Sequence, residues 1–99
     1  MATFITLIKF TPQGVTAIQD TCKRAAAFKA AAKKLGGKVT ATYWTQGPFD
    51  GVLVFEAPDD DTATALMLHL GSQGFVQTRT ARAFTAAEME KILAAAAGK

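Results

Sequence analysis

Two periodicities alternate along this chain, in an order that few folds accommodate. The runs 3–10, 38–45, 51–57 and 75–84 are short and rich in β-branched and aromatic residues, which is typical of strands. Between them, residues 12–35 and 59–70 carry apolar residues at three- and four-residue steps, which is typical of amphipathic helices. The order β-α-β-β-α-β predicts an α+β, ferredoxin-like plait with a four-stranded antiparallel sheet and both long helices on one face.

Capping and turn residues support these boundaries. Thr11-Pro12 suits the start of the first helix, because Thr is a good N-cap and Pro fits the first helical position. We expect this helix to run without interruption to Leu35, with Cys22 on its buried stripe. The aspartates that follow Pro58 suit the positive end of a helix. Thr85 to Glu88 matches a capping box, which predicts an additional C-terminal helix.

Length and composition predict a single domain over residues 1–99 in the cytoplasm. A chain of 99 residues is the size of one typical domain. Its one cysteine cannot form an internal disulfide, which favours a reducing compartment. The start of the chain lacks a signal-peptide layout, and no apolar run approaches the roughly 20 residues that span a membrane. The formal net charge of +3 attracts anions weakly and does not indicate nucleic-acid binding.

Both faces of the predicted sheet carry apolar side chains. Phe4 and Ile8 alternate with Ile5 and Leu7, and the run 51–57 is apolar on both sides as well. A sheet face without helices is normally polar, so an apolar one needs a cover. A second copy of the chain is one cover and a ligand cavity is another, and two sheets pressed together would provide both. We therefore predict a homodimer or higher homo-oligomer of the dimeric α+β barrel type.

Short motifs make the chain resemble a known family. They are Lys23-Arg24, LGGK at 35–38, GPFD at 47–50, EAPDD at 56–60, LGSQG at 70–74 and RAFT at 82–85. In this order and spacing they are similar to the GYD-domain family of small bacterial and archaeal proteins. The family signature Gly-x-Tyr/Phe-Asp falls on residues 47–50, with Phe49 as its aromatic residue. The resemblance implies a relation to dimeric α+β barrel proteins and supplies no substrate.

Asp50 is the first candidate for a binding site, because it stands at the entrance to the third strand. It is either a general base or ligand anchor, or a turn residue whose carboxylate accepts backbone N–H groups or pairs with an arginine. The second interpretation is favoured. Arg24 and Arg82 are candidate partners, whereas Arg79 lies on the opposite face of its strand from Arg82. An inward arginine would bind a carboxylate or phosphate.

The aromatic pair Tyr43 and Trp44 completes the candidate ligand site. These neighbours lie on opposite faces of a strand, and the one that faces away from the helices is the candidate to line a cavity. His69 is the only histidine, and Cys22 has no other cysteine or histidine at a metal-binding spacing. The sequence therefore predicts neither a metal site nor a cofactor.

The functional prediction is small-molecule binding at the sheet face, near Asp50 and Arg82, in a homo-oligomer. The alternative is a cofactor-independent enzyme, similar to a monooxygenase or an isomerase, that acts on a small organic substrate. The sequence leaves open whether the chain is an enzyme. RNA binding is the weakest hypothesis, because DGVLVFEA at 50–57 lacks the aromatic residues with which RNA-recognition motifs stack bases. We expect neither a nucleic-acid partner nor a membrane partner.

Overall fold

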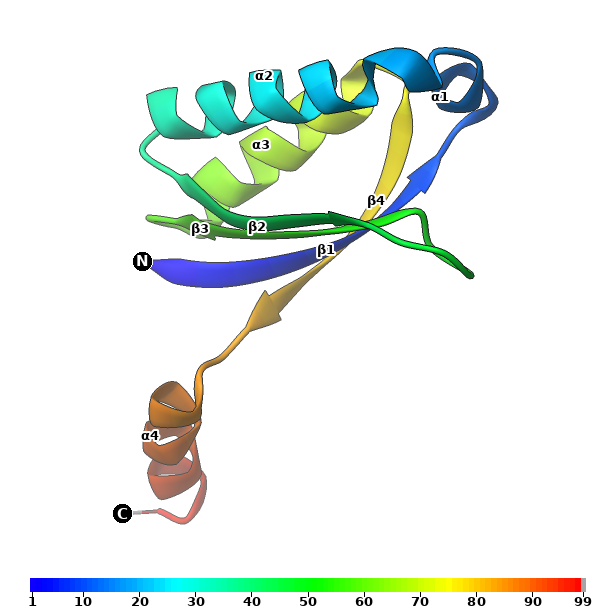
Figure 1. The fold of residues 1–99 in the computed structure, drawn as a ribbon. Helices are drawn as coiled ribbons and strands as arrows, with labels where there is room; N and C mark the ends of the chain where they lie inside the picture. The colour runs from blue at the N-terminus through cyan, green and yellow to red at the C-terminus, as the bar shows by residue number, and fades with distance from the viewer. Residues whose placement is uncertain (99) are drawn as a thin grey trace.

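The computed structural model describes residues 1–98, and its elements follow the predicted order (Figure 1). The elements are β1 (Ala2–Phe10), α1 (Pro12–Thr16), the short 3-10 helix η1 (Ile18–Asp20), α2 (Thr21–Lys34), β2 (Lys38–Trp44), β3 (Gly51–Ala57), α3 (Asp60–Ser72), β4 (Val76–Ala83) and α4 (Ala86–Ala96). The four strands form one antiparallel sheet in the order β2-β3-β1-β4. This is the ferredoxin-like arrangement, and it confirms the predicted fold class.

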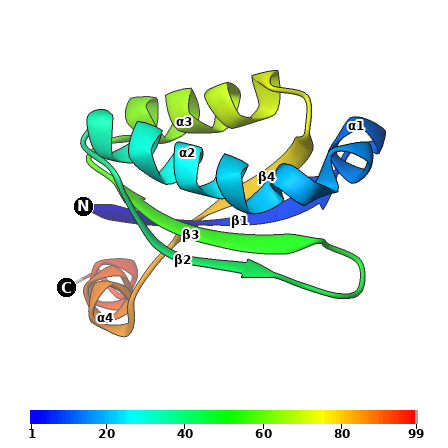
Figure 2. The ribbon, with the colours of Figure 1, turned by 45° about the horizontal axis from the view of Figure 1, so that its top comes forward.

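Only one of the two faces of the sheet is covered by the helix pair. Helices α2 and α3 lie together over one face, whereas α4 hangs from the end of β4 on the opposite side (Figures 1 and 2). We call the side without α2 and α3 the open face. No helix in the described part of the chain is long and apolar enough to cross a membrane.

The core lies between the sheet and the helix pair. Its buried apolar residues come from β1, β3, α2 and α3: Phe4, Phe28, Ala32, Leu53, Phe55, Ala57, Ala63 and Leu66. The rings of Phe4 and Phe55 stack with their centroids 5.3 Å apart. The one fully buried polar side chain in this part of the sheet, Thr6, shares a hydrogen bond of 2.9 Å with Thr80 on β4. Alternate residues of β1 and β3 therefore build the core, as the strand period requires.

The prediction of one uninterrupted first helix is wrong. The helical segment breaks near Ala17, because α1 is held against the start of β4. The Thr11 N–H donates to the carbonyl of Phe75 at 3.1 Å, and a Cβ on Gly14 would lie only 2.0 Å from the same oxygen. Only glycine permits that approach. The chain must then turn before it runs back over the sheet as α2.

The break also shifts the buried stripe of the helix. Phe28 and Ala32 face the core as expected, but Val15 is 60% exposed and Cys22 is exposed. The predicted core position of Cys22 is therefore wrong. Cys22 was assigned to the core by a helical period that began in α1, and the break near Ala17 interrupts that period.

The predicted caps of the other helices are confirmed. Asp59 accepts the Thr62 N–H at 2.7 Å, and Thr85 and Glu88 form a complete capping box. The hydrogen bond from the Thr62 N–H lowers the pKa of Asp59, and the bond from the Thr85 N–H lowers the pKa of Glu88. Both carboxylates therefore stabilise their helix ends in the ionised form.

Candidate functional site

Asp50 ties the hairpin between β2 and β3 to the end of β1. Its carboxylate Oδ2 accepts the Phe10 N–H at 2.8 Å, its own N–H donates to the Ile8 carbonyl at 2.8 Å, and its carbonyl accepts the Thr45 N–H at 2.9 Å. Within residues 1–98 no arginine or lysine forms an ion pair with it. This geometry matches the interpretation of Asp50 as a turn residue that accepts a backbone N–H.

Replacing Asp50 by Ala is expected to lower the free energy of unfolding by about 1.5–3 kcal/mol. The change leaves the half-buried Phe10 N–H without its charged acceptor, and hydrogen bonds to charged groups are worth about that much. Asp50→Asn keeps an acceptor oxygen and is the matched control, with an expected loss below about 1 kcal/mol. Urea unfolding followed by circular dichroism measures both. Equal losses in the two variants would contradict this role.

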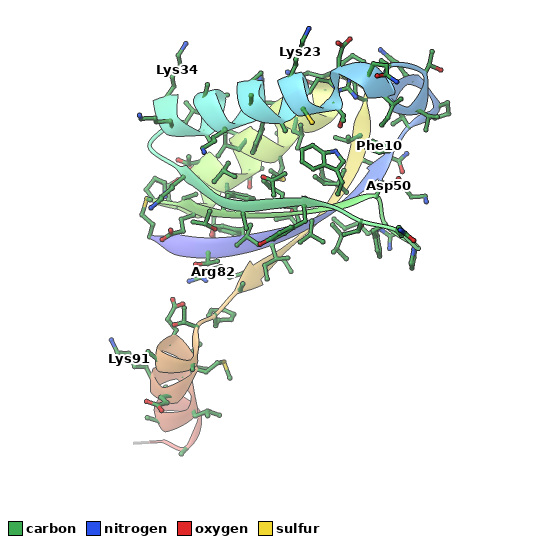
Figure 3. All side chains as sticks on the ribbon, viewed as in Figure 1. Phe10, Lys23, Lys34, Asp50, Arg82 and Lys91 are labelled. Atoms are coloured by element: carbon green, nitrogen blue, oxygen red, sulfur yellow. The ribbon has the colours of Figure 1, made fainter. Side chains whose placement is uncertain are left out.

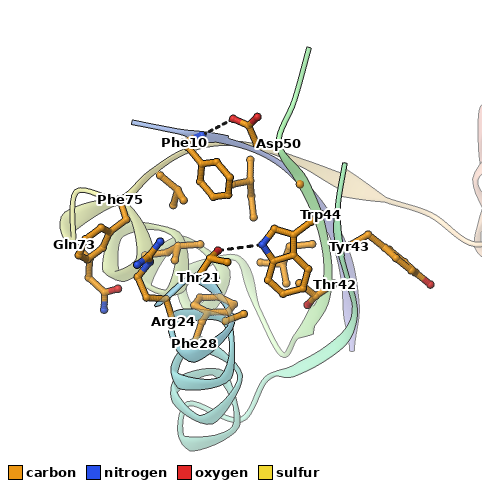
Figure 4. Close-up of a pocket in the computed structure, with 16 residues that line it drawn as sticks. Phe10, Thr21, Arg24, Phe28, Thr42, Tyr43, Trp44, Asp50, Gln73 and Phe75 are labelled. Carbon is orange, nitrogen blue, oxygen red and sulfur yellow. Dashed lines mark hydrogen bonds between the residues drawn. The ribbon is translucent and has the colours of Figure 1, made fainter. Parts of the chain in front are cut away.

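A cavity lies beside Asp50, between α2 and the helix-covered side of the sheet (Figure 4). Its volume is about 70 Å³. The walls are mostly apolar and come from four strands, α2, α3 and the segment before β4: Ile8, Phe10, Thr21, Arg24, Ala25, Phe28, Thr42, Tyr43, Trp44, Asp50, Gly51, Leu53, Leu70, Gln73, Phe75 and Val76. The sequence placed a cavity on the open face, whereas this one lies under the helices.

Arg24 brings a positive charge into the wall of the cavity. One guanidinium nitrogen, Nη1, donates to the Ala17 carbonyl at 2.8 Å, and the guanidinium carbon lies 4.3 Å from the centre of the Phe75 ring. The other nitrogen, Nη2, is buried and has no hydrogen-bond partner among residues 1–98. An arginine held by one carbonyl and one aromatic face keeps donors for a further acceptor.

The side chains of Tyr43 and Trp44, which are neighbours on β2, point to opposite sides of the strand. The indole of Trp44 faces the cavity and donates its Nε1–H to the Thr21 hydroxyl at 3.1 Å (Figure 4). Tyr43 also belongs to the wall, but its ring points away from the cavity and the residue is 64% exposed (Figure 4). Trp44 is thus the one whose side chain enters the site, because the helices and not the open face enclose the cavity.

Arg82 lies apart from this cavity (Figure 3). It forms an ion pair of 3.4 Å with Glu88 on α4 and donates to the carbonyls of Thr3 and Ala83. Its guanidinium also stacks on Phe84, 4.5 Å from the ring centre. Arg82 therefore connects the end of β4 to the start of α4. The structure brings Asp50, Arg24 and Trp44 together and leaves Arg82 at the far end of the sheet.

Thr21 and Phe75 are two of the wall residues that the sequence did not single out. Thr21 is recognisable in hindsight, because it stands three residues before Arg24 and so shares its helix face. Phe75 has no such sequence signal, because it stacks on Arg24, which lies 51 positions earlier in the chain. Contacts of this length depend on the complete fold.

The polar groups of the cavity wall include one carboxylate. Oxygen Oδ2 of Asp50 accepts the Phe10 N–H, whereas His69 and Cys22 are exposed and lie outside the wall. Across residues 1–98 no three histidine, cysteine or acidic side chains gather where they could hold a metal ion. What remains in the wall is one cation, a few hydroxyl and amide groups, and a large aromatic surface.

A second feature is the apolar surface that the sheet and α4 leave uncovered. On the open face it consists of Ile5, Leu7, Tyr43, Val52 and Val54, and along the last helix of Phe84, Met89, Ile92 and Leu93. We call this set the uncovered surface. Leu93 is 58% exposed, and no residue of α4 is buried. A short amphipathic helix is rarely stable in water without packing, so this surface indicates a missing contact.

Comparisons with known proteins agree with the fold and the motifs. The model of the GYD domain matches residues 4–93. A protein of Thermus thermophilus, described as a glutamine synthetase and cystathionine beta-lyase binding protein, is 36% identical over 90% of this chain and 95% of its own length. The crystal structure of TTHA0845, also from Thermus thermophilus, is 25% identical, with a TM-score of 0.56 over 87% of this chain and 96% of that one. The chain therefore belongs to the GYD domain family.

Proposed function

We propose that this chain is a homodimeric protein-binding protein: two copies pair through the uncovered surface, and the pair binds a metabolic enzyme. The observation that carries the proposal is the uncovered surface itself. The open face and α4 lie on the same side of the sheet, so one partner can cover both (Figure 1). A second copy suits this position, because an apolar sheet face can pair with itself about a two-fold axis.

The exposed surface area of the chain is consistent with burial against a second copy. The chain exposes 6522 Å², whereas a compact monomer of its mass exposes about 5400 Å². The excess of about 1100 Å² is comparable to the roughly 800 Å² that each partner buries in a standard interface. The radius of gyration, 15.1 Å, also exceeds the roughly 13 Å of a compact chain of this length. Helix α4 projects from the body, which increases both values (Figure 1).

The similar protein from Thermus thermophilus suggests which enzymes this chain binds. The Thermus protein that is 36% identical is named for binding glutamine synthetase and cystathionine beta-lyase. We propose that this chain binds an enzyme of the same two classes from its own cell. This function agrees with a location in the cytoplasm, which the single cysteine also predicts.

The test is direct binding of the purified dimer to purified glutamine synthetase and cystathionine beta-lyase from the same organism. We expect a dissociation constant of about 1 μM or lower for at least one of them, by surface plasmon resonance. The Ile5→Glu variant, which is expected to be monomeric, separates binding by the pair from binding by one copy. If the wild-type protein binds neither enzyme, the enzyme-binding proposal fails. The pairing of the two copies is tested separately, by the mass of the wild-type protein.

Small-molecule binding in the cavity beside Arg24 is a second candidate function. The buried Nη2 of Arg24 without a partner among the described residues favours it. In this candidate the ligand contacts Arg24, Trp44 and the rim near Asp50, while roles for Tyr43 and Arg82 in a ligand site stay predictions. Catalysis on a small organic substrate also stays a prediction. The two candidates are compatible, since the cavity and the uncovered surface lie on opposite sides of the sheet.

A further inference from the structure

We infer that the cavity beside Arg24 binds a short-chain aliphatic monocarboxylate, with the carboxylate at Arg24 and Thr21 and the hydrocarbon against the aromatic walls. This inference rests on the second candidate function, that the cavity takes a small molecule. The cavity has the two parts that such a ligand needs. One wall carries hydrogen-bond donors and a positive charge, and most of the rest is apolar. The Asp50 carboxylate also belongs to the lining, where it accepts the Phe10 N–H (Figure 4).

The charge of Arg24 lacks a compensating group within the described chain. Ion pairs in that part of the structure join Lys23 to Asp20 and Arg82 to Glu88, and none involves Arg24. Its buried Nη2 accordingly has no acceptor, and leaving a buried donor without one is unfavourable. Arg24 also stands in the first turn of α2, where the helix dipole disfavours a cation. An anion in the cavity removes both penalties.

Thr21 supplies a second donor on the same wall. Its hydroxyl oxygen accepts the indole N–H of Trp44 at 3.1 Å, which orients the side chain and leaves its own hydrogen available. Thr21 and Arg24 are three residues apart on α2, so both side chains lie on the helix face that lines the cavity (Figure 4). A carboxylate has two oxygens, one for each donor. Phosphate would leave further oxygens against apolar walls.

The size of the cavity limits the rest of the ligand. Its volume is about 70 Å³, and an apolar cavity of about 150 Å³ is known to hold benzene. The space therefore suits a short hydrocarbon chain better than an aromatic ring. Phe10, Phe28 and Leu53 form apolar walls for that chain. Butyrate is the natural probe, and butan-1-ol is its uncharged counterpart with the same carbon chain.

The experiment titrates each compound into the full chain at pH 7 and follows backbone amide shifts by NMR. We expect saturable binding of butyrate, with the largest shifts at residues around the cavity, and binding of butan-1-ol at least about 10-fold weaker, because it lacks the charged acceptor. Arg24→Gln should weaken butyrate binding by about 10-fold or more. Lys23→Gln removes the same charge from an exposed neighbour that points away from the sheet (Figure 3) and should change the affinity less than about twofold.

The possible results distinguish carboxylate binding at Arg24 from small-molecule binding in general. If butan-1-ol binds in the cavity as well as butyrate, the carboxylate assignment fails and small-molecule binding stands. If neither compound binds up to about 20 mM, the cavity is not a ligand site of this class and both fail. If Arg24→Gln and Lys23→Gln weaken butyrate equally, the effect is general electrostatics and the assignment of Arg24 fails. The butyrate and butan-1-ol comparison in the wild type decides the question even if Arg24→Gln does not fold.

Discussion

A Phe55→Ala variant is expected to lose about 3–5 kcal/mol of unfolding free energy. Phe55 is fully buried in β3, and its ring stacks on Phe4 of β1, the other central strand of the sheet. Truncation removes this contact and leaves a cavity that the surrounding strands cannot close. A domain of 99 residues has a total stability of about 5–15 kcal/mol, so the variant is brought near the limit of folding.

Urea unfolding at one fixed protein concentration measures this loss, because the stability of a dimer depends on concentration. Val15→Ala is the control, since Val15 is apolar but 60% exposed on α1, and its expected change is below about 0.5 kcal/mol. A loss below about 1 kcal/mol for Phe55→Ala would show that the stacked pair is not the centre of the core.

The second large effect concerns assembly: Ile5→Glu should convert the proposed dimer to a folded monomer. Ile5 lies on β1 at the middle of the open face, between Val54 and Ala81 of the neighbouring strands. Pairing would bury its carboxylate without a partner, which costs several kcal/mol and weakens the dimer by at least about 100-fold. The fold itself should persist, because this side chain faces away from the core.

Size-exclusion chromatography with light scattering reports the mass, and circular dichroism reports the fold. Val15→Glu introduces the same charge at an exposed apolar position on α1, outside the uncovered surface, and should stay dimeric. If Ile5→Glu and Val15→Glu have the same mass, the open face is not where two copies pair.

The sequence was most informative where structure is local. The alternation of strand and helix periods determines the element order, and the caps at Asp59 and Thr85 depend on residues within three positions. The element order and these caps need no knowledge of which segments meet in space. The partner of Asp50 does, because its carboxylate accepts the N–H of Phe10, 40 positions away on β1.

The sequence was least informative where distant segments meet. The break of the first helix depends on the contact between Gly14 and Phe75, which no periodicity reveals. The distance between Asp50 and Arg82 depends on strand pairing. Arg82 pairs with Phe4 near the start of β1, whereas Asp50 binds Phe10 at its end. Six residues of strand separate these ends by about 20 Å.

The cavity beside Arg24 was not predicted, for a related reason. An apolar open face suggests a site between two sheets, but the residues of the cavity lie under the helices. Trp44 and Arg24 reach it from β2 and α2 because both face the inner side of the sheet. The motif Lys23-Arg24 marked the right segment. It could not show that Arg24 turns inward while Lys23 turns to solvent.

Native mass spectrometry of the wild-type chain tests the central claim most directly. The account predicts a dominant species of twice the 10.4 kDa chain mass at low micromolar concentration, because it proposes that two copies pair through the uncovered surface. The same spectrum shows whether a small molecule is retained. A species of 10.4 kDa alone, from protein whose circular dichroism shows the full fold, would contradict pairing through the open face and α4.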